Sequence, residues 1–238
     1  MKIDQNEKVG EIVKLDIRTA HVFKKHGIDF CCGGGISLDK VCERHEISLP
    51  KLISELEETT AEVNPEVPNY DEWSAAELCD YIEENHHSYV KESLPMLQAY
   101  AEKVASVHGH HHPELVEMLP KVNLLVSDLS HHLQKEEMVL FPWIRKFVET
   151  DGQVMPPFGK FDNPVRMMEE EHDLAGEIMH ELRAMSNNYN LPEYACNTWR
   201  AYFHLLDEFE DDLHMHIHLE NNVLHLKARA FDAMQHVN

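Results

Sequence analysis

The chain has 238 residues, of which 43% are hydrophobic, and its 43 Asp and Glu against 21 Lys and Arg give a formal net charge of -22. This hydrophobic fraction is enough to build a core, which excludes wholesale disorder. The excess of carboxylates repels nucleic acid and anionic lipid, so neither is expected as a partner. The 19 His residues are unusual, because neutral imidazole is the commonest metal ligand in proteins.

The cysteine count and the N-terminal sequence predict a cytoplasmic protein. Five cysteines are an odd number in a chain too long to need disulfide staples, so a disulfide framework is not expected. The first residues are charged and lack the apolar segment of a signal peptide. No apolar run approaches the roughly 18–20 residues that span a membrane.

The first 58 residues are predicted to form a small helical domain. Apolar residues recur with helical spacing in four short segments, at 9–15, 17–26, 38–44 and 49–57. Ser37 and Ser48 are suitable N-caps for the last two of these helices. Residues 59–72 are polar, contain two prolines and lack periodicity, so they are predicted to be a linker.

Residues 73–238 are predicted to form an antiparallel four-helix bundle, which makes the whole chain all-α. Helical periodicity places the four long helices at about 74–106, 113–149, 163–187 and 192–235. A capping box formed by Ser74 and Glu77 is expected to open the first of them. Long helices joined by shorter loops pack as antiparallel neighbours.

The bundle sequence contains an internal repeat of potential ligands. The second and fourth helices share the pattern H-x3-E-x2-V-L, which begins at His132 and again 84 positions later at His216. The first and third helices share E-x-x-H, which ends at His87 and 85 positions later at His172. We interpret the bundle as two copies of a helix pair related by a pseudo-twofold axis, with these groups around one central point.

The repeated His and Glu residues lie on helix faces that otherwise carry apolar residues, if each residue turns the helix by ~100°. The predicted interior stripes are, for the second helix, Leu125, Leu129, His132, Glu136, Leu140 and Trp143; for the third, Val165, Met168, His172, Ala175, Met179 and Leu182; and for the fourth, Leu206, Phe209, Leu213, His216, Glu220 and Val223. A buried carboxylate is costly unless it is paired or bound to a cation. The four matched helices therefore favour a metal site over two buried His–Glu pairs. The same H-x3-E spacing at His110 and at His204 shows that one such motif carries little weight, and His204 is expected to face outward.

Four His and two Glu suit a pair of iron ions. If Glu136 and Glu220 bridge the ions, each receives two imidazole nitrogens and two carboxylate oxygens. An oxo or hydroxo bridge then leaves one open position on each iron. The spacing does not separate His86 from His87 as the ligand from the first helix.

A rival arrangement follows the ferritin-like rule, in which two helices each supply one Glu and the other two each supply E-x-x-H. It would take Glu136 and Glu220 as the single glutamates, together with the pairs Glu84/His87 and Glu169/His172. Because it leaves His132 and His216 unexplained on their interior stripes, the His-rich set is preferred.

Two adjacent thiols, Cys31 and Cys32, are followed by three glycines in the segment from Asp29 to Gly35. The glycines are expected to let the backbone approach another surface closely and to adopt positive φ. The thiols can bind metal or undergo oxidation and reduction. The remaining cysteines, Cys42, Cys79 and Cys196, are interpreted as ordinary helix-face residues. The histidine-rich loop 108–112 is predicted to be solvated, with metal scavenging as the alternative.

Taken together, these motifs resemble those of the repair-of-iron-centres family, in which a ScdA-type N-terminal domain precedes a hemerythrin-like domain. The segment HVFKKHGIDFCCGGG resembles the N-terminal domain, and KEEMVLFP, EEEHDLAGE and HIHLENNVL resemble the second, third and fourth bundle helices. The sequence departs from the family at His225-Leu226, where Phe-Pro is usual, which puts the end of the last helix in doubt. The resemblance places the iron ligands at His87, His132, Glu136, His172, His216 and Glu220.

The resemblance implies a cytoplasmic stress-response protein that repairs iron–sulfur clusters damaged by nitric oxide or oxidants, as an iron donor. It implies two iron ions per chain, a role for Cys31 and Cys32 in iron or electron transfer, and damaged iron–sulfur proteins as clients. It is also compatible with homodimers. A repair protein is favoured over a turnover enzyme. The alternatives are a hemerythrin-like protein that binds or senses O2 or NO, and a di-iron NO reductase or peroxidase.

Overall fold

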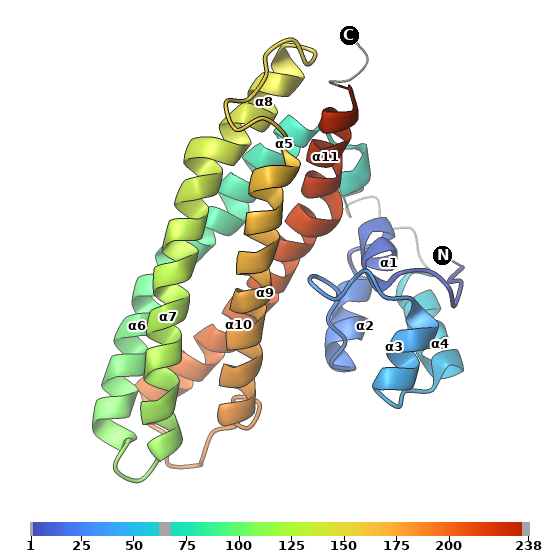
Figure 1. Cartoon of the computed structure of the whole chain (residues 1–238). Helices are drawn as coiled ribbons and strands as arrows, with labels where there is room; N and C mark the ends of the chain where they lie inside the picture. Colours follow the sequence, from blue (N-terminus) through green and yellow to red (C-terminus); the bar gives the residue numbers. More distant parts are fainter. Residues whose placement is uncertain (1, 62–67, 235–238) are drawn as a thin grey trace. The chain divides into compact units, whose positions relative to one another are not determined.

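The computed structural model describes residues 2–61 and 68–234, and this part of the chain is helical, with one isolated bridge between Lys8 and Ser37 and no β-strand (Figure 1). The all-α prediction is confirmed. Residues 62–67 of the predicted linker and residue 235 of the last predicted helix lie outside the described residues. Contacts divide the chain into two compact units, residues 79–213 and residues 1–78 with 214–238.

The unit of residues 79–213 is built on four helices, α6 (Ser88–His108), α7 (Pro113–Lys135), α9 (Asp162–Met185) and the first part of α10 (Asn197–Leu219). Helix α7 packs along both α6 and α9, which run beside it in Figure 1. Arg183 of α9 forms ion pairs with two carboxylates of α10, and Tyr89 at the start of α6 stacks on a phenylalanine of α10. Each helix therefore has two neighbours, which confirms the predicted helical bundle.

Three π-helical turns interrupt these helical lines, and each contains a predicted ligand. The turn η2 (Ile82–His87) joins α5 (Ala75–Tyr81) to α6, and η3 (Glu136–Leu140) joins α7 to α8 (Phe141–Glu149). The turn η4 (Glu220–Leu224) joins α10 to the last helix. Such turns are rare and are found frequently at functional sites. These turns are absent from the prediction, because an α-helical period was assumed throughout.

One residue predicted to face the interior of the second helix does not do so, because it lies beyond the turn η3. Every predicted position of the stripe up to Leu140 is buried, but Trp143 is only half-buried, while Ile144 and Phe147 are buried in its place. A π turn contains one more residue than an α turn, so the interior face moves by one position beyond it. The predicted stripes of the third and fourth helices are buried in full.

The fourth bundle helix begins later than predicted, at Asn197 rather than Pro192. Residues 192–196 are not helical, with a turn at Glu193 and Tyr194, and the carbonyls of Glu193 and Ala195 accept hydrogen bonds from the Arg200 guanidinium. This side chain satisfies acceptors that helical amides would otherwise satisfy. At its other end this helix continues through η4 into α11 (His225–Met234). The His225-Leu226 pair, which replaces the Phe-Pro usual in the family, therefore does not end the helix.

The other unit contains four short helices close to the predicted ones. They are α1 (Val9–Leu15), α2 (Thr19–Lys25), α3 (Leu38–Arg44) and α4 (Leu49–Thr59), followed by a short 3-10 helix, η1 (Tyr70–Glu72). Ser37 and Ser48 occupy the predicted N-cap positions with extended backbones, but neither side chain makes a capping hydrogen bond. The Ser37 hydroxyl donates instead to the carboxylate of Asp39.

The described helices, taken over residues 2–61 and 68–234, are each too short or too polar to cross a lipid bilayer.

The predicted capping box at the start of α5 is confirmed and can be tested for its effect on stability. The Ser74 amide donates to Glu77 Oε2 at 2.7 Å, and the Glu77 amide donates to Ser74 Oγ at 3.2 Å. We expect Ser74→Ala to lower the free energy of unfolding by about 1 kcal/mol in urea denaturation followed by circular dichroism. Ser74→Asp keeps an acceptor at the N-cap and should retain the stability. Equal stability of Ser74→Ala and the unaltered chain would contradict the assignment.

Candidate metal centre

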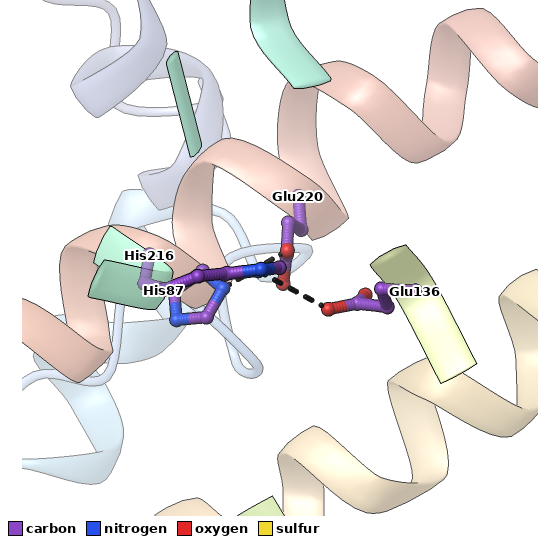
Figure 2. Close-up of side chains that lie close together, drawn as sticks. All are labelled: His87, Glu136, His216 and Glu220. Carbon is purple, nitrogen blue, oxygen red and sulfur yellow. Dashed lines mark hydrogen bonds and ion pairs between the residues drawn. The ribbon is translucent and has the colours of Figure 1, made fainter. Parts of the chain in front are cut away.

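All six predicted ligands are buried, with exposed fractions of 1% or less. Their donor atoms fall into two overlapping sets, each lying within 4.8 Å. The sets are His87, Glu136, His216 and Glu220, drawn in Figure 2, and His132, Glu136, His172 and Glu220. The two glutamates belong to both sets, as bridging carboxylates would.

The His132 imidazole shows that this donor set fits a cation. His132 Nε2 lies 3.0 Å from His172 Nε2 and 3.2 Å from Glu136 Oε2. His87 Nε2 approaches the same carboxylate oxygen at 3.4 Å (Figure 2). Two facing imidazole nitrogens can share only one proton, whereas a metal ion accepts the lone pair of each.

The two predicted ligands of the fourth helix lie one turn apart on a continuous helical line. His216 lies on the same helix face as Leu213, and its Nε2 is 2.9 Å from Glu220 Oε1 (Figure 2). Glu220 is the first residue of η4, just as Glu136 is the first residue of η3. The repeat seen in the sequence is therefore also a repeat of local backbone structure.

Two further carboxylates hold the outer nitrogens of these imidazoles. His87 Nδ1 lies 2.8 Å from Glu137 Oε1, and His132 Nδ1 lies 3.0 Å from Glu171 Oε2. The hydrogen bond with His132 is the main reason why the pKa of Glu171 lies below its usual value. Burial raises the pKa of Glu137, but hydrogen bonds from Lys91 and His87 outweigh it and the net pKa is lowered. An Nδ1–H bonded to a carboxylate leaves the Nε2 lone pair for a metal.

Sequence reasoning missed Glu137 and Glu171. The available signal was that each lies next to a predicted ligand in a run of glutamates. Spacing along one helix gave no indication that these side chains reach a histidine on another helix.

The two adjacent histidines of η2 have different surroundings in the structure. His87 belongs to the first ligand set, whereas His86 Nδ1 lies 2.8 Å from Asp212 Oδ1 and belongs to neither set. The ferritin-like alternative is not formed, because Glu84 is exposed and neither Glu84 nor Glu169 belongs to either set. The geometry therefore favours the His-rich ligands.

The H-x3-E spacing at His204 behaves as expected of a chance match. Its side chain is 73% exposed, and that of Glu208 is 56% exposed, with 3.5 Å between His204 Nε2 and Glu208 Oε1. This pair therefore provides an exposed control on the same helix as His216.

The histidine-rich loop is less solvated than predicted. The rings of His108 and His112 pack against Trp199, and His108 Nε2 lies 3.1 Å from Cys196 Sγ. His112 Nε2 lies 2.8 Å from the hydroxyl of Tyr194. The prediction of a solvated loop is confirmed for His110 and His111, which are exposed, whereas His108 and His112 are half-buried because aromatic side chains beyond α9 cover them.

The dicysteine loop is organised around the Asp29 carboxylate. Its Oδ1 accepts hydrogen bonds from the amides of Cys31 and Cys32 at 2.9 and 3.0 Å, and its Oδ2 accepts one from the Gly33 amide at 2.8 Å. The two sulfurs are 3.9 Å apart, and each belongs to a free thiol. The neighbouring thiol and burial raise the pKa of Cys31 well above its usual value, while Cys32 is partly exposed. Asp29 and the two thiols form a third group of potential ligand atoms within 4.8 Å.

The glycines after the thiols serve close packing rather than unusual backbone angles. None of the three has a positive φ, so that part of the prediction was wrong. A Cβ on Gly34 would lie 2.4 Å from the carbonyl oxygen of Phe30 and 3.0 Å from Gly10 Cα. The expected close approach of the backbone is therefore confirmed at Gly34.

Comparisons with known proteins agree with the predicted family. Residues 80–228 match the family model described as the hemerythrin HHE cation-binding domain, and residues 5–60 match the ScdA_N model, a domain of unknown function. A probable iron-sulfur cluster repair protein from Haemophilus influenzae is 33% identical, covering 92% of this chain and 94% of that protein. The iron-sulfur cluster repair proteins YtfE of Cronobacter sakazakii and Musicola paradisiaca are 36% and 34% identical, covering 95% and 94% of this chain and 97% and 96% of theirs.

Substitution of the two adjacent histidines distinguishes a ligand from a structural residue. We expect His87→Ala to lower the iron bound after reconstitution with Fe(II), because it removes a donor from the first ligand set. His86→Ala should retain the iron but lower the melting temperature, because it leaves Asp212 without its imidazole partner. Iron is measured by mass spectrometry and melting by circular dichroism. Full iron binding by His87→Ala would refute the assignment.

Removal of an outer carboxylate tests whether it orients its histidine. We expect Glu137→Ala to weaken metal affinity by about 10- to 100-fold, the usual effect of losing such a partner. Glu208→Ala removes an exposed carboxylate that also lies opposite a histidine, and it should leave the affinity unchanged. Competition with a chelator measures both. Equal affinity of the two variants would show that Glu137 does not support His87.

Proposed function

Because the chain belongs to the family of iron–sulfur cluster repair proteins that join a ScdA-type domain to a hemerythrin-like domain, we propose that it restores damaged iron–sulfur clusters by supplying iron. The observation that carries this proposal is the buried set of four imidazoles and two carboxylates with converging donor atoms. Damaged iron–sulfur proteins are the proposed clients.

We propose that the site holds two iron ions. The first would be held by His87 and His216 and the second by His132 and His172, with Glu136 and Glu220 bridging them together with an oxo or hydroxo group. The membership of both glutamates in both ligand sets supports this division. Iron bound in this way supplies reversible change between the ferrous and ferric states.

A cavity beside the second ligand pair supports exchange of iron with the outside. It has a volume of about 420 Å³, lies between α7 and α9, and includes His132 among its lining residues. Asp128 in its lining attracts cations, Glu171 is paired there with Lys135, and Leu125 and Ile178 give the cavity an apolar wall. This is the side of the bundle from which we propose that iron leaves.

The thiol pair is the proposed transfer site for iron or electrons. Cys32 is partly exposed and can meet a client, and Cys31 lies buried beside it. Thiolates are soft ligands that bind iron in clusters, so a dicysteine loop suits a protein whose product is an iron–sulfur centre. Asp29 adds an oxygen donor to the two sulfurs.

The cavity also favours a second candidate function, which is binding of O2 or NO at the iron pair without repair. Such binding would need only the bundle, so it does not account for the dicysteine loop. A third possibility, steady reduction of NO or peroxide, predicts continued consumption of the substrate in the presence of an electron donor. Repair with stoichiometric loss of iron distinguishes the proposed function from both.

The role of the thiols is tested with a variant that keeps the iron centre. We expect Cys31→Ala/Cys32→Ala to bind the full complement of iron with an unchanged absorption spectrum. It should restore the activity of a nitric-oxide-damaged iron–sulfur enzyme no faster than iron salts alone. The matched control is Cys196→Ala, which removes a thiol outside the loop and should repair at the normal rate. Normal repair by the double variant would overturn the proposed role.

A further inference from the structure

The side chain of Asn222 ties the dicysteine loop to the turn that carries an iron ligand. Its Nδ2 donates to the carbonyl oxygen of Cys31 at 3.1 Å and lies 3.5 Å from that of Phe30. The same nitrogen lies 3.1 Å from Nδ1 of His218. We infer that Asn222 is a positioning residue that couples the exposure of the thiol pair to iron binding at Glu220.

Asn222 and the dicysteine loop both pack closely against Gly10 of α1. A Cβ on Gly10 of α1 would lie 2.9 Å from Asn222 Oδ1 and 3.2 Å from the carbonyl oxygen of Gly34. The Gly10 amide donates to that same carbonyl at 2.8 Å. The Asn222 amide therefore fits a space that exists because Gly10 lacks a side chain.

An aromatic contact fixes the same loop to the end of α10. The ring of Phe30 packs edge-on against His214 and His218, with ring centroids 6.0 and 5.9 Å apart. Phe30 is buried and directly precedes the thiol pair. The loop thus rests on the helical segment that contains His216.

The coupling follows from the backbone of η4. Glu220 and Asn222 belong to the same five-residue π turn. A metal ion held by Glu220 would fix the direction of its carboxylate and so the rotation of this turn. Because only one residue separates them, a rotation at Glu220 moves the Asn222 amide and, with it, the carbonyl of Cys31. This inference rests on the proposed iron centre and adds a residue that links it to the thiols.

Alkylation of Cys32 measures the coupling without a repair assay. The full chain, iron-loaded or stripped of iron, is treated with iodoacetamide, and modification is followed by mass spectrometry. We expect the two forms to differ in rate by about fivefold or more. Asn222→Asp cannot donate to the Cys31 carbonyl, so its two forms should react at the same rate. Its iron content and absorption spectrum should be unchanged, a combination that general loss of structure would not give.

Two glycine variants provide an independent test of the same contact. Gly10→Ala presses on Asn222 and should also abolish the rate difference. Gly35→Ala lies in the glycine run after the thiols and places its methyl group in open space, so it should behave like the unaltered chain. If the loop and the iron site are coupled through Asn222, alkylated thiols should also change the equilibrium iron affinity of the unaltered chain but not that of Asn222→Asp.

The results separate this inference from the proposed function. A rate difference that persists in both Asn222→Asp and Gly10→Ala, or that is absent from the unaltered chain, would overturn the coupling. If the coupling is present while Cys31→Ala/Cys32→Ala still repairs clusters, the proposed thiol function fails and the positioning role of Asn222 stands.

Discussion

The fold depends on the burial of two carboxylates and four imidazoles among apolar side chains. Removing a carboxylate from water costs several kcal/mol even after the protein relaxes, and its partners must compensate for that cost. Here Glu136 and Glu220, both with no exposed surface, share the interior with histidines whose Nε2 atoms approach carboxylate oxygens. A pair of cations would compensate both carboxylates at once. The helices must then hold their registers, because a slip of one residue would move a ligand out of the core.

Local periodicity was sufficient to predict most of this arrangement. A histidine and a glutamate four positions apart lie on one face of any helix, so the inward direction of His132, Glu136, His216 and Glu220 could be inferred without knowing the neighbours. The bounds of α1 and α3 and the Ser74 capping box were predicted for the same reason, since their signals lie within a few residues. Trp143 was misplaced because a π turn changes the period.

Contacts between distant segments could not be predicted in this way. Glu171 reaches His132 across 39 positions, and Asn222 reaches Cys31 across 191. Neither separation corresponds to a helical period or to a turn motif. The choice between His86 and His87 was open for the same reason, because it depends on Asp212, a residue on another helix.

The two ligand-bearing π turns differ in what their other residues do. In η3, Glu136 points inward while the next residue, Glu137, bonds the outer nitrogen of His87. In η4, Glu220 points inward while Asn222 bonds the dicysteine loop. A π turn widens the helix by one residue, which allows closely spaced side chains to serve opposite sides of the same turn. The repeat is therefore symmetric in its predicted inner ligands and asymmetric in its outer contacts, and among the described residues it is the copy with Glu220 whose turn contacts the dicysteine loop.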